Sequence, residues 1–187
     1  AAGLGIAIAK GLTELMGGSI AAKSGREKGT VFRVELAFDR MEEKEKTEAE
    51  SEALAGKRLL LAEDDRLCGE ILCELLEDET GRPVSITANG RAALEMFESA
   101  NGEYDAIIMD VQMPVMNGYE AARAIRRSGC GNAKTVPIIA LTADASEESA
   151  RAAADSGMNG CLAKPVNIDR LRKAVAAALK SLSVAYR

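Results

Sequence analysis

IIMDVQMPVMNG, residues 107–118, runs from an apolar segment into an aspartate and then into a loop with proline and glycine. The run at its start, AIIM at 106–109, is apolar on both faces, which is typical of a strand inside a parallel sheet. Pro114 and Gly118 are suited to shape the loop and the start of the next helix. The stretch therefore predicts a buried strand that ends at Asp110.

Short apolar runs of the same kind alternate with segments of helical periodicity along the C-terminal part of the chain. The other runs are LLLA (59–62), VSITA (84–88), PIIAL (137–141) and GCLA (160–163). Leu67, Ile71 and Leu75 indicate the first helix between them, and Asn167 is placed to cap the last one. Strands that alternate with helices in this way predict an α/β fold with a right-handed, doubly wound, five-stranded parallel sheet.

The residues that follow these strands carry the chemistry of the chain. Glu63 and Asp64 follow the first strand, Asp110 the third, Thr142 the fourth and Lys164 the fifth. Since ligands bind outside the carboxyl ends of parallel strands, we expect these side chains to share one crevice. Crowded carboxylates repel one another unless a cation neutralises them, and an all-oxygen site suits Mg²⁺ completed by a phosphate. The pattern indicates transfer of a phosphoryl group to a carboxylate nucleophile.

The segments that carry these residues resemble the four signatures of the response-regulator receiver domain, in order and at the family's spacing. They are LLLAEDD, IIMDVQMPVMNG, PIIALTA and GCLAKPV, and the resemblance covers residues 57–181. It implies a flavodoxin-like fold with strand order 2-1-3-4-5. It also implies that an aspartate takes a phosphoryl group from a partner's phosphohistidine, on a histidine kinase core or a histidine phosphotransfer protein.

The family pattern can be carried over residue by residue. It makes Asp110 the phosphoacceptor, Thr142 the switch hydroxyl and Lys164 the phosphate-binding lysine, and the bond between Lys164 and Pro165 resembles the family's cis peptide. Cys161 stands where many receivers carry Tyr or Phe. The Mg²⁺ ligands that the resemblance implies are Asp64, Asp110, the backbone carbonyl of Gln112 and, through water, Glu63.

Three other functions stay open beside relay of the phosphoryl group. The receiver could act as a phosphate sink, or as an interaction module that works without phosphorylation. The third is a phosphatase of the haloacid dehalogenase type, which also uses an aspartate nucleophile at the end of a parallel strand. That type needs a second aspartate two residues after the first, where this chain has Gln112. The sequence therefore favours a receiver over such a phosphatase.

The first forty residues, which begin AAGLGIAIAKGLTELMGGSI, resemble the end of a histidine-kinase ATP-binding domain: a last glycine box, a helix and two closing strands. The resemblance implies that Gly3 and Gly5 lie beside the ATP phosphates in the full-length parent, a hybrid sensor histidine kinase. One helix and two strands make too small a core to stand alone. They could be disordered, packed on the receiver or paired with a second copy in a dimer.

Composition sets the remaining expectations. The segment MEEKEKTEAESEALA predicts a linker, so we divide the chain into the kinase fragment 1–40, the acidic linker 41–56 and the receiver 57–187. A net charge of −5, scattered basic residues and 3% aromatics argue against nucleic-acid binding. The absence of long apolar segments predicts a cytoplasmic chain without membrane contact, although its parent could be membrane-anchored. With no histidine in the chain, only receiver phosphotransfer and autodephosphorylation are expected of it.

Overall fold

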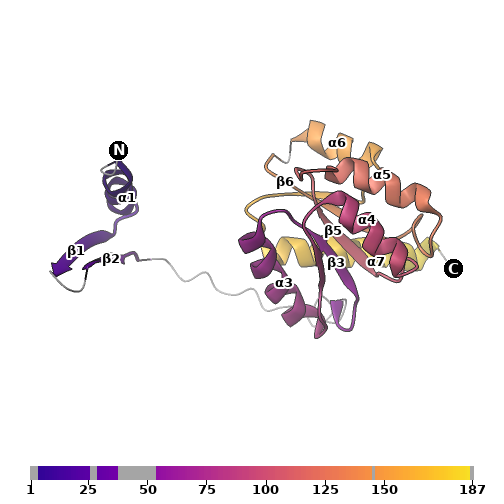
Figure 1. The fold of residues 1–187 in the computed structure, drawn as a ribbon, viewed down its shortest axis with the longest axis horizontal. Helices are drawn as coiled ribbons and strands as arrows, with labels where there is room; N and C mark the ends of the chain where they lie inside the picture. The colour runs from indigo at the N-terminus through magenta and orange to yellow at the C-terminus, as the bar shows by residue number, and fades with distance from the viewer. Residues whose placement is uncertain (1–3, 26–28, 38–53, 145, 186–187) are drawn as a thin grey trace. The chain divides into compact units, whose positions relative to one another are not determined.

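The computed structural model describes residues 4–25, 29–37, 54–144 and 146–185. The chain divides into two compact units, Ala1–Glu45 and Lys46–Arg187 (Figure 1). Gly3 and most of the predicted linker lie outside the described residues. None of the helices in the described part is long and apolar enough to cross a membrane.

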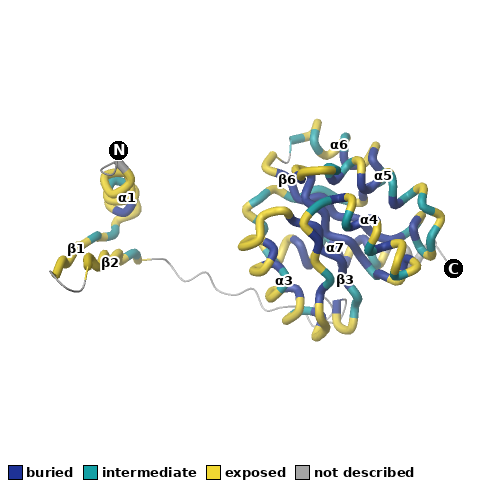
Figure 2. The backbone as a smooth tube through the Cα atoms, viewed as in Figure 1, coloured by how far each residue is buried: buried dark blue, intermediate teal, exposed yellow. Residues whose placement is uncertain are grey.

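The N-terminal unit holds the predicted helix and two strands. Helix α1 is Leu4–Leu15, and the strands β1 (Ser19–Gly25) and β2 (Gly29–Glu35) form an antiparallel pair. Ile8, Leu12 and Phe32 are exposed by roughly half of their surface, and Figure 2 shows how little of this unit is buried. A unit of this size cannot cover its own apolar side chains.

The C-terminal unit is a five-stranded parallel sheet with helices on both faces (Figure 1). The strands lie in the order β4-β3-β5-β6-β7, which confirms the predicted order 2-1-3-4-5. The strands are β3 (Leu59–Ala62), β4 (Ser85–Thr87), β5 (Ala106–Asp110), β6 (Ile138–Thr142) and β7 (Gly160–Ala163). The helices are α3 (Arg66–Thr80), α4 (Gly90–Ser99), α5 (Gly118–Ser128), α6 (Glu147–Asp155) and α7 (Ile168–Ala185).

The central strands are buried at every position and apolar up to their last residues, because both faces of the sheet are covered. Alternate side chains of one strand enter different clusters. Ile107 of β5 packs into the cluster that contains α4 and α5, while the next residue, Ile108, packs into the cluster that contains α3 and α7. Both side chains are fully buried. Because both faces of the sheet are buried, its polar side chains gather at the ends of the strands.

Helix α3 is present, but the residues that indicate it in the sequence lie on its exposed side. Leu67, Ile71 and Leu75 are 66%, 50% and 37% exposed. Leu72 and Leu76 face the sheet instead and are 6% and 1% exposed. The helix therefore carries two apolar stripes, of which only one contributes to the core.

The packed part of the C-terminal unit begins before its first strand. Leu54, which falls in the predicted linker, is fully buried in the cluster with α3 and α7. The Gly56 backbone N–H donates to the Thr80 carbonyl oxygen at 2.7 Å, at the end of α3. The residues directly before β3 are thus held on the core.

Candidate functional site

The predicted site residues meet at the carboxyl edge of the sheet. Glu63 and Asp64 directly follow β3, Asp110 ends β5, Thr142 ends β6 and Lys164 directly follows β7. Because the strands are parallel and in register, these ends lie along one edge. Carboxylate oxygens of Glu63, Asp64 and Asp110 lie within 4.8 Å of one another. The structure therefore brings together the acidic residues that the sequence predicts.

Lys164 joins two of these carboxylates. Its ammonium lies 2.7 Å from a carboxylate oxygen of Glu63 and 2.7 Å from Asp110 Oδ2. The side chains of Glu63 and Asp110 are almost entirely buried, whereas that of Lys164 is partly exposed. One ammonium faces a cluster with three carboxyl groups, so two negative charges are left without compensation when all three are ionised. A set of oxygen donors with this charge suits a hard divalent cation.

The pKa values of Glu63 and Lys164 reflect burial as well as charge. Burial is the main influence that raises the pKa of Glu63, and the neighbouring charge of Asp110 adds to the rise, while the hydrogen bond from Lys164 acts in the opposite direction. Burial acts to lower the pKa of Lys164, but its hydrogen bonds to Asp110 and Glu63 outweigh that effect, and the pKa of Lys164 is raised. Lys164 is therefore a fixed positive charge at neutral pH.

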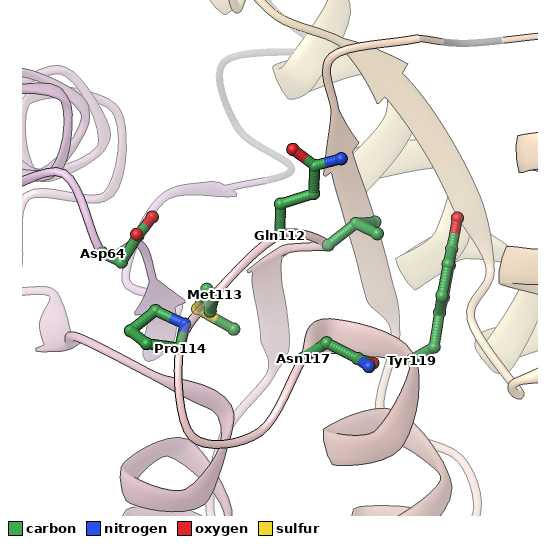
Figure 3. A pocket seen from close by; sticks show the side chains of 7 residues that line it. Asp64, Gln112, Met113, Pro114, Asn117 and Tyr119 are labelled. Carbon is green, nitrogen blue, oxygen red and sulfur yellow. The ribbon is translucent and has the colours of Figure 1, made fainter.

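Asp64 is the exposed member of the acidic cluster and faces an open pocket. The pocket has a volume of about 530 Å³, and Gln112, Pro114 and Tyr119 also line it. Figure 3 shows Asp64 on one side of this space and Tyr119 on the other, with the loop after β5 between them. A ligand can thus reach the cluster from solvent on the Asp64 side.

The loop after β5 fixes the backbone around Asp110. The Gln112 N–H donates to Asp110 Oδ1 at 3.0 Å, and the Lys164 ammonium donates to Oδ2, so both oxygens of this carboxylate are held. The α-carbon of Gly118 lies against the Asp110 carbonyl oxygen, in a space that a Cβ would fill. Val115 has a φ of +68°, and the Met116 N–H bonds to the Pro114 carbonyl oxygen across it, which forms a γ-turn.

Thr142 and the residues around it complete the edge. Thr142 is buried, and its Oγ1 accepts a hydrogen bond from the Asp144 N–H at 3.3 Å. Cys161, on the neighbouring strand β7, is partly buried, and burial is the main cause that raises the pKa of its thiol. The bond between Lys164 and Pro165 is cis, as the resemblance predicts.

The two glycines predicted to lie beside the ATP phosphates belong to the N-terminal unit. Gly5 is an exposed residue in the first turn of α1, in the other unit, and Gly3 lies outside the described residues. Tyr119 and Asn117, which line the pocket, are not among the site residues predicted from the sequence. Asn117 could have been found from the sequence. It caps α5 in a capping box with Glu120, and an Asn followed three residues later by Glu is typical of such a box.

Solved structures with this fold include receiver domains from bacteria. The receiver domain of the sensor histidine kinase PA1611 from Pseudomonas aeruginosa PAO1, with a magnesium ion coordinated in its active-site cleft, is 36% identical with a TM-score of 0.58. The similarity covers 67% of this chain and 99% of that one. Chemotaxis protein CheY4 of Vibrio cholerae is 33% identical with a TM-score of 0.60, over 66% of this chain and 99% of that one.

Similar sequences occur in long sensor proteins. The virulence sensor protein BvgS of Bordetella bronchiseptica is 32% identical over 91% of this chain, and the sensor histidine kinase AruS of Pseudomonas aeruginosa is 34% identical over 92%. The chain spans only 14% and 17% of the lengths of these two relatives. The family described as the response regulator receiver domain matches residues 59–176, which include every member of the acidic cluster and Lys164. This chain therefore belongs to the response regulator receiver family, whose members act in two-component phosphorelay signalling.

Proposed function

We propose that Asp110 accepts a phosphoryl group from a phosphohistidine of another polypeptide, with Mg²⁺ bound at the acidic cluster, and that the group is then passed on or hydrolysed. One observation supports this most strongly. The Lys164 ammonium lies 2.7 Å from Asp110 Oδ2 at the open edge of the sheet, where it can meet both the acceptor and an incoming phosphoryl oxygen. The charge of Lys164 thus stands where negative charge develops during transfer.

The transfer forms one bond and breaks one. An oxygen of the Asp110 carboxylate attacks phosphorus while the bond between phosphorus and the imidazole nitrogen breaks, and the electron pair stays on that nitrogen. The product is an acyl phosphate, and attack of water on its phosphorus restores the carboxylate and releases inorganic phosphate. Lys164 donates to the phosphoryl oxygens. The Thr142 hydroxyl accepts from the Asp144 N–H and can still donate its own proton to a phosphoryl oxygen.

The acidic cluster is suited to hold the metal ion. We assign Asp64, Asp110 and the backbone carbonyl of Gln112 as direct ligands and Glu63 as a ligand through water. The three carboxyl groups with a single ammonium among them support this assignment, as does the magnesium ion in the related PA1611 receiver. Bound there, Mg²⁺ supplies positive charge that offsets the carboxylates and the phosphoryl oxygens.

A small phosphodonor tests the proposal directly. The full chain is incubated with Mg²⁺ and acetyl phosphate, and its intact mass is followed over time. We expect the wild type to gain one phosphoryl group that hydroxylamine removes, because acyl phosphates react with this nucleophile, and Asp110→Asn to gain none. An unlabelled wild type, or equal labelling of the Asp110→Asn variant, would overturn the assignment.

We further propose that the chain comes from a hybrid sensor histidine kinase, in which residues 1–40 close the ATP-binding domain. The similarity to BvgS covers 91% of this chain, which is more than residues 54–187 can account for, so it reaches into the N-terminal unit. The exposed apolar side chains of α1 and β2 agree with a unit that lacks part of its core. A longer chain that includes the upstream domain should bind ATP and bury these side chains.

A further inference from the structure

Tyr119 reaches from the start of α5 to the first turn of α6. Its hydroxyl donates to the Ser149 carbonyl oxygen at 3.5 Å, and its ring is partly buried against the cluster that contains α4 and α5. Cys161 of β7 packs against the same cluster. Burial raises the pKa of the Tyr119 phenol, and the charge of Cys161 adds to the rise. The phenol therefore keeps its proton at neutral pH and is a hydrogen-bond donor.

The Tyr119 side chain starts from a fixed point at the phosphoacceptor. The α-carbon of Gly118, the residue before it, lies against the Asp110 carbonyl oxygen. The Gly118 N–H also donates to the Val111 carbonyl oxygen at 3.0 Å. The position of Tyr119 is thus set by the end of β5, and its hydroxyl links this end to α6.

A row of hydrogen bonds leads from Ser149 back to the carboxyl edge of the sheet. The Ser149 N–H donates to Ser146 Oγ at 3.3 Å, and the Ser146 N–H donates to Asp144 Oδ1 at 3.1 Å. The Asp144 N–H in turn donates to Thr142 Oγ1 at 3.3 Å. The row therefore joins the residue that Tyr119 holds to the hydroxyl that ends β6.

Helix α6 has little core packing of its own. The structure describes all of its residues, and among these only Ala153 is buried. Side chains of α5 hold both of its ends. Tyr119 contacts its first turn, and a guanidinium nitrogen of Arg123 donates at 2.7 Å to Oγ of Ser156, directly after its last residue. Because a helix with few buried side chains has low local stability, the loss of one of these contacts should displace it.

We propose that Tyr119 is a positioning residue for phosphoryl transfer, which holds the first turn of α6 so that the Thr142 hydroxyl can reach the phosphoryl group on Asp110. The proposal rests on the proposed function, because it assumes the transfer to Asp110. Thr142 Oγ1 accepts from the Asp144 N–H, so the hydroxyl proton points to other acceptors and can meet a phosphoryl oxygen. A displacement of about 1 Å in a group of this kind can slow a reaction about 10²-fold.

A double-mutant cycle with a small phosphodonor tests whether Tyr119 acts through Thr142. The full chain is labelled with acetyl phosphate at saturating Mg²⁺, and the rate is followed by intact mass. Tyr119→Phe removes only the phenol oxygen, and Thr142→Val supplies the second background. Tyr104→Phe is the matched control, because the Tyr104 hydroxyl donates to Ser85 Oγ at 3.1 Å at the opposite edge of the sheet, before β5 begins. Circular dichroism and thermal unfolding check that each variant is folded.

We expect Tyr119→Phe to slow labelling about fivefold, the rate equivalent of one net hydrogen bond. In the Thr142→Val background the same substitution should change the rate by less than about twofold, because the group that it positions is gone. Tyr104→Phe should label like the wild type. Calorimetric titration should give Tyr119→Phe the Mg²⁺ affinity of the wild type, since the row of hydrogen bonds includes no member of the acidic cluster.

Ser146 offers a second test in the middle of the row. Ser146→Ala removes the oxygen that accepts from the Ser149 N–H, whereas Ser146→Asn keeps a capping acceptor at the start of α6. Ser146→Ala should slow labelling about as much as Tyr119→Phe, and Ser146→Asn should restore most of the rate. If Ser146→Ala labelled as fast as the wild type, the row would not position Thr142.

The outcomes separate this proposal from the proposed function. Equal labelling rates for the wild type and Tyr119→Phe would overturn it. So would an effect of Tyr119→Phe that has the same size in both backgrounds, because Tyr119 would then act without Thr142. A loss of Mg²⁺ affinity in Tyr119→Phe would overturn it as well and assign Tyr119 to the metal site. A wild type that acetyl phosphate cannot label would remove the proposed function itself.

Discussion

Gly118 and Asp110 are in backbone contact: the α-carbon of Gly118 lies against the carbonyl oxygen of Asp110, with no room for a side chain between them. The Gly118 N–H also donates to the Val111 carbonyl oxygen at 3.0 Å. The start of α5 is thus pressed onto the end of β5 at the residue that we assign as the phosphoacceptor.

Gly118→Ala should therefore disturb the acceptor directly. The added methyl group meets backbone atoms, which cannot rotate away, so we expect a loss of about 1–3 kcal/mol in the free energy of unfolding, the usual cost of overpacking. Labelling by acetyl phosphate should slow as well. Gly160→Ala is the control, because its methyl group would meet only the mobile end of the Ile139 side chain. If the two variants were equally stable in urea unfolding, the contact between Gly118 and Asp110 would not require a glycine at position 118.

Lys164→Met should separate metal binding from phosphoryl transfer. The variant keeps the three carboxyl groups but loses the ammonium that competes with a cation for them, so Mg²⁺ should bind at least as tightly as in the wild type. Transfer should slow about 10²-fold or more, since a donor aimed at the developing charge is lost. Calorimetric titration with Mg²⁺ and labelling by acetyl phosphate measure the two effects. A variant that loses Mg²⁺ affinity but keeps its rate would contradict the role assigned to Lys164.

The stability of the metal-free protein should depend on Glu63 in a defined direction. Burial raises the pKa of Glu63 from its ordinary value of 4.5, so the folded state holds this proton more tightly than the unfolded chain. The folded state then binds more protons between the two pKa values, and the free energy of unfolding falls as pH rises through that interval. Glu63→Gln should remove this contribution.

Urea unfolding of the wild type and of Glu63→Gln, with Mg²⁺ chelated, measures how the free energy of unfolding depends on pH. The range from about pH 4 to about pH 8 starts near the ordinary pKa of a glutamate and extends well above it. Glu95→Gln, an exposed substitution on α4, is the control. Added Mg²⁺ at neutral pH should raise the Tm of the wild type, because binding to the folded state stabilises it. Parallel pH profiles for the wild type and Glu63→Gln would contradict the prediction.

Arg172 should matter for stability but not for the reaction. Its guanidinium makes two hydrogen bonds to Glu79, at 2.9 and 3.0 Å, and both side chains are more than nine-tenths buried between α3 and α7. Arg172→Ala removes both of these hydrogen bonds to the buried carboxylate of Glu79, so we expect a loss of about 3–5 kcal/mol in the free energy of unfolding, the usual cost of breaking a buried ion pair. Arg170→Ala, at an exposed position on the same helix, should cost little. Labelling of the folded Arg172→Ala fraction should match the wild type, and a selective loss of labelling would place Arg172 in the mechanism.

The edge of the sheet could be predicted because strand direction determines it. Parallel strands end on the same side, so the residues after each apolar run, such as Glu63, Asp110 and Lys164, had to converge. The fold followed from the same runs, although β4 is shorter than the run VSITA, with Ser85–Thr87 as the paired residues. Local sequence was sufficient to predict the strands because the apolar pattern of each run had only one interpretation.

The orientation of α3 could not be predicted in this way. Its sequence offers one stripe with Ile71 and Leu75 and another with Leu72 and Leu76, and both have helical spacing. Which stripe faces the sheet depends on packing between elements distant in sequence, for example on Gly69, where a Cβ would collide with Ile86 of β4. Tyr119 was missed for a similar reason, because its place in the pocket depends on the path of the loop before α5.

The burial of Leu54 places the start of the packed receiver before its first strand. A chain cut at Lys57, where the first strand is about to begin, would lose a fully buried leucine and open a void under α3 and α7. Voids left by large aliphatic side chains cost about 2–5 kcal/mol, a large share of the stability of a domain. The residues directly before β3 are therefore part of the packed core of the receiver as well as its connection to the preceding part of the chain.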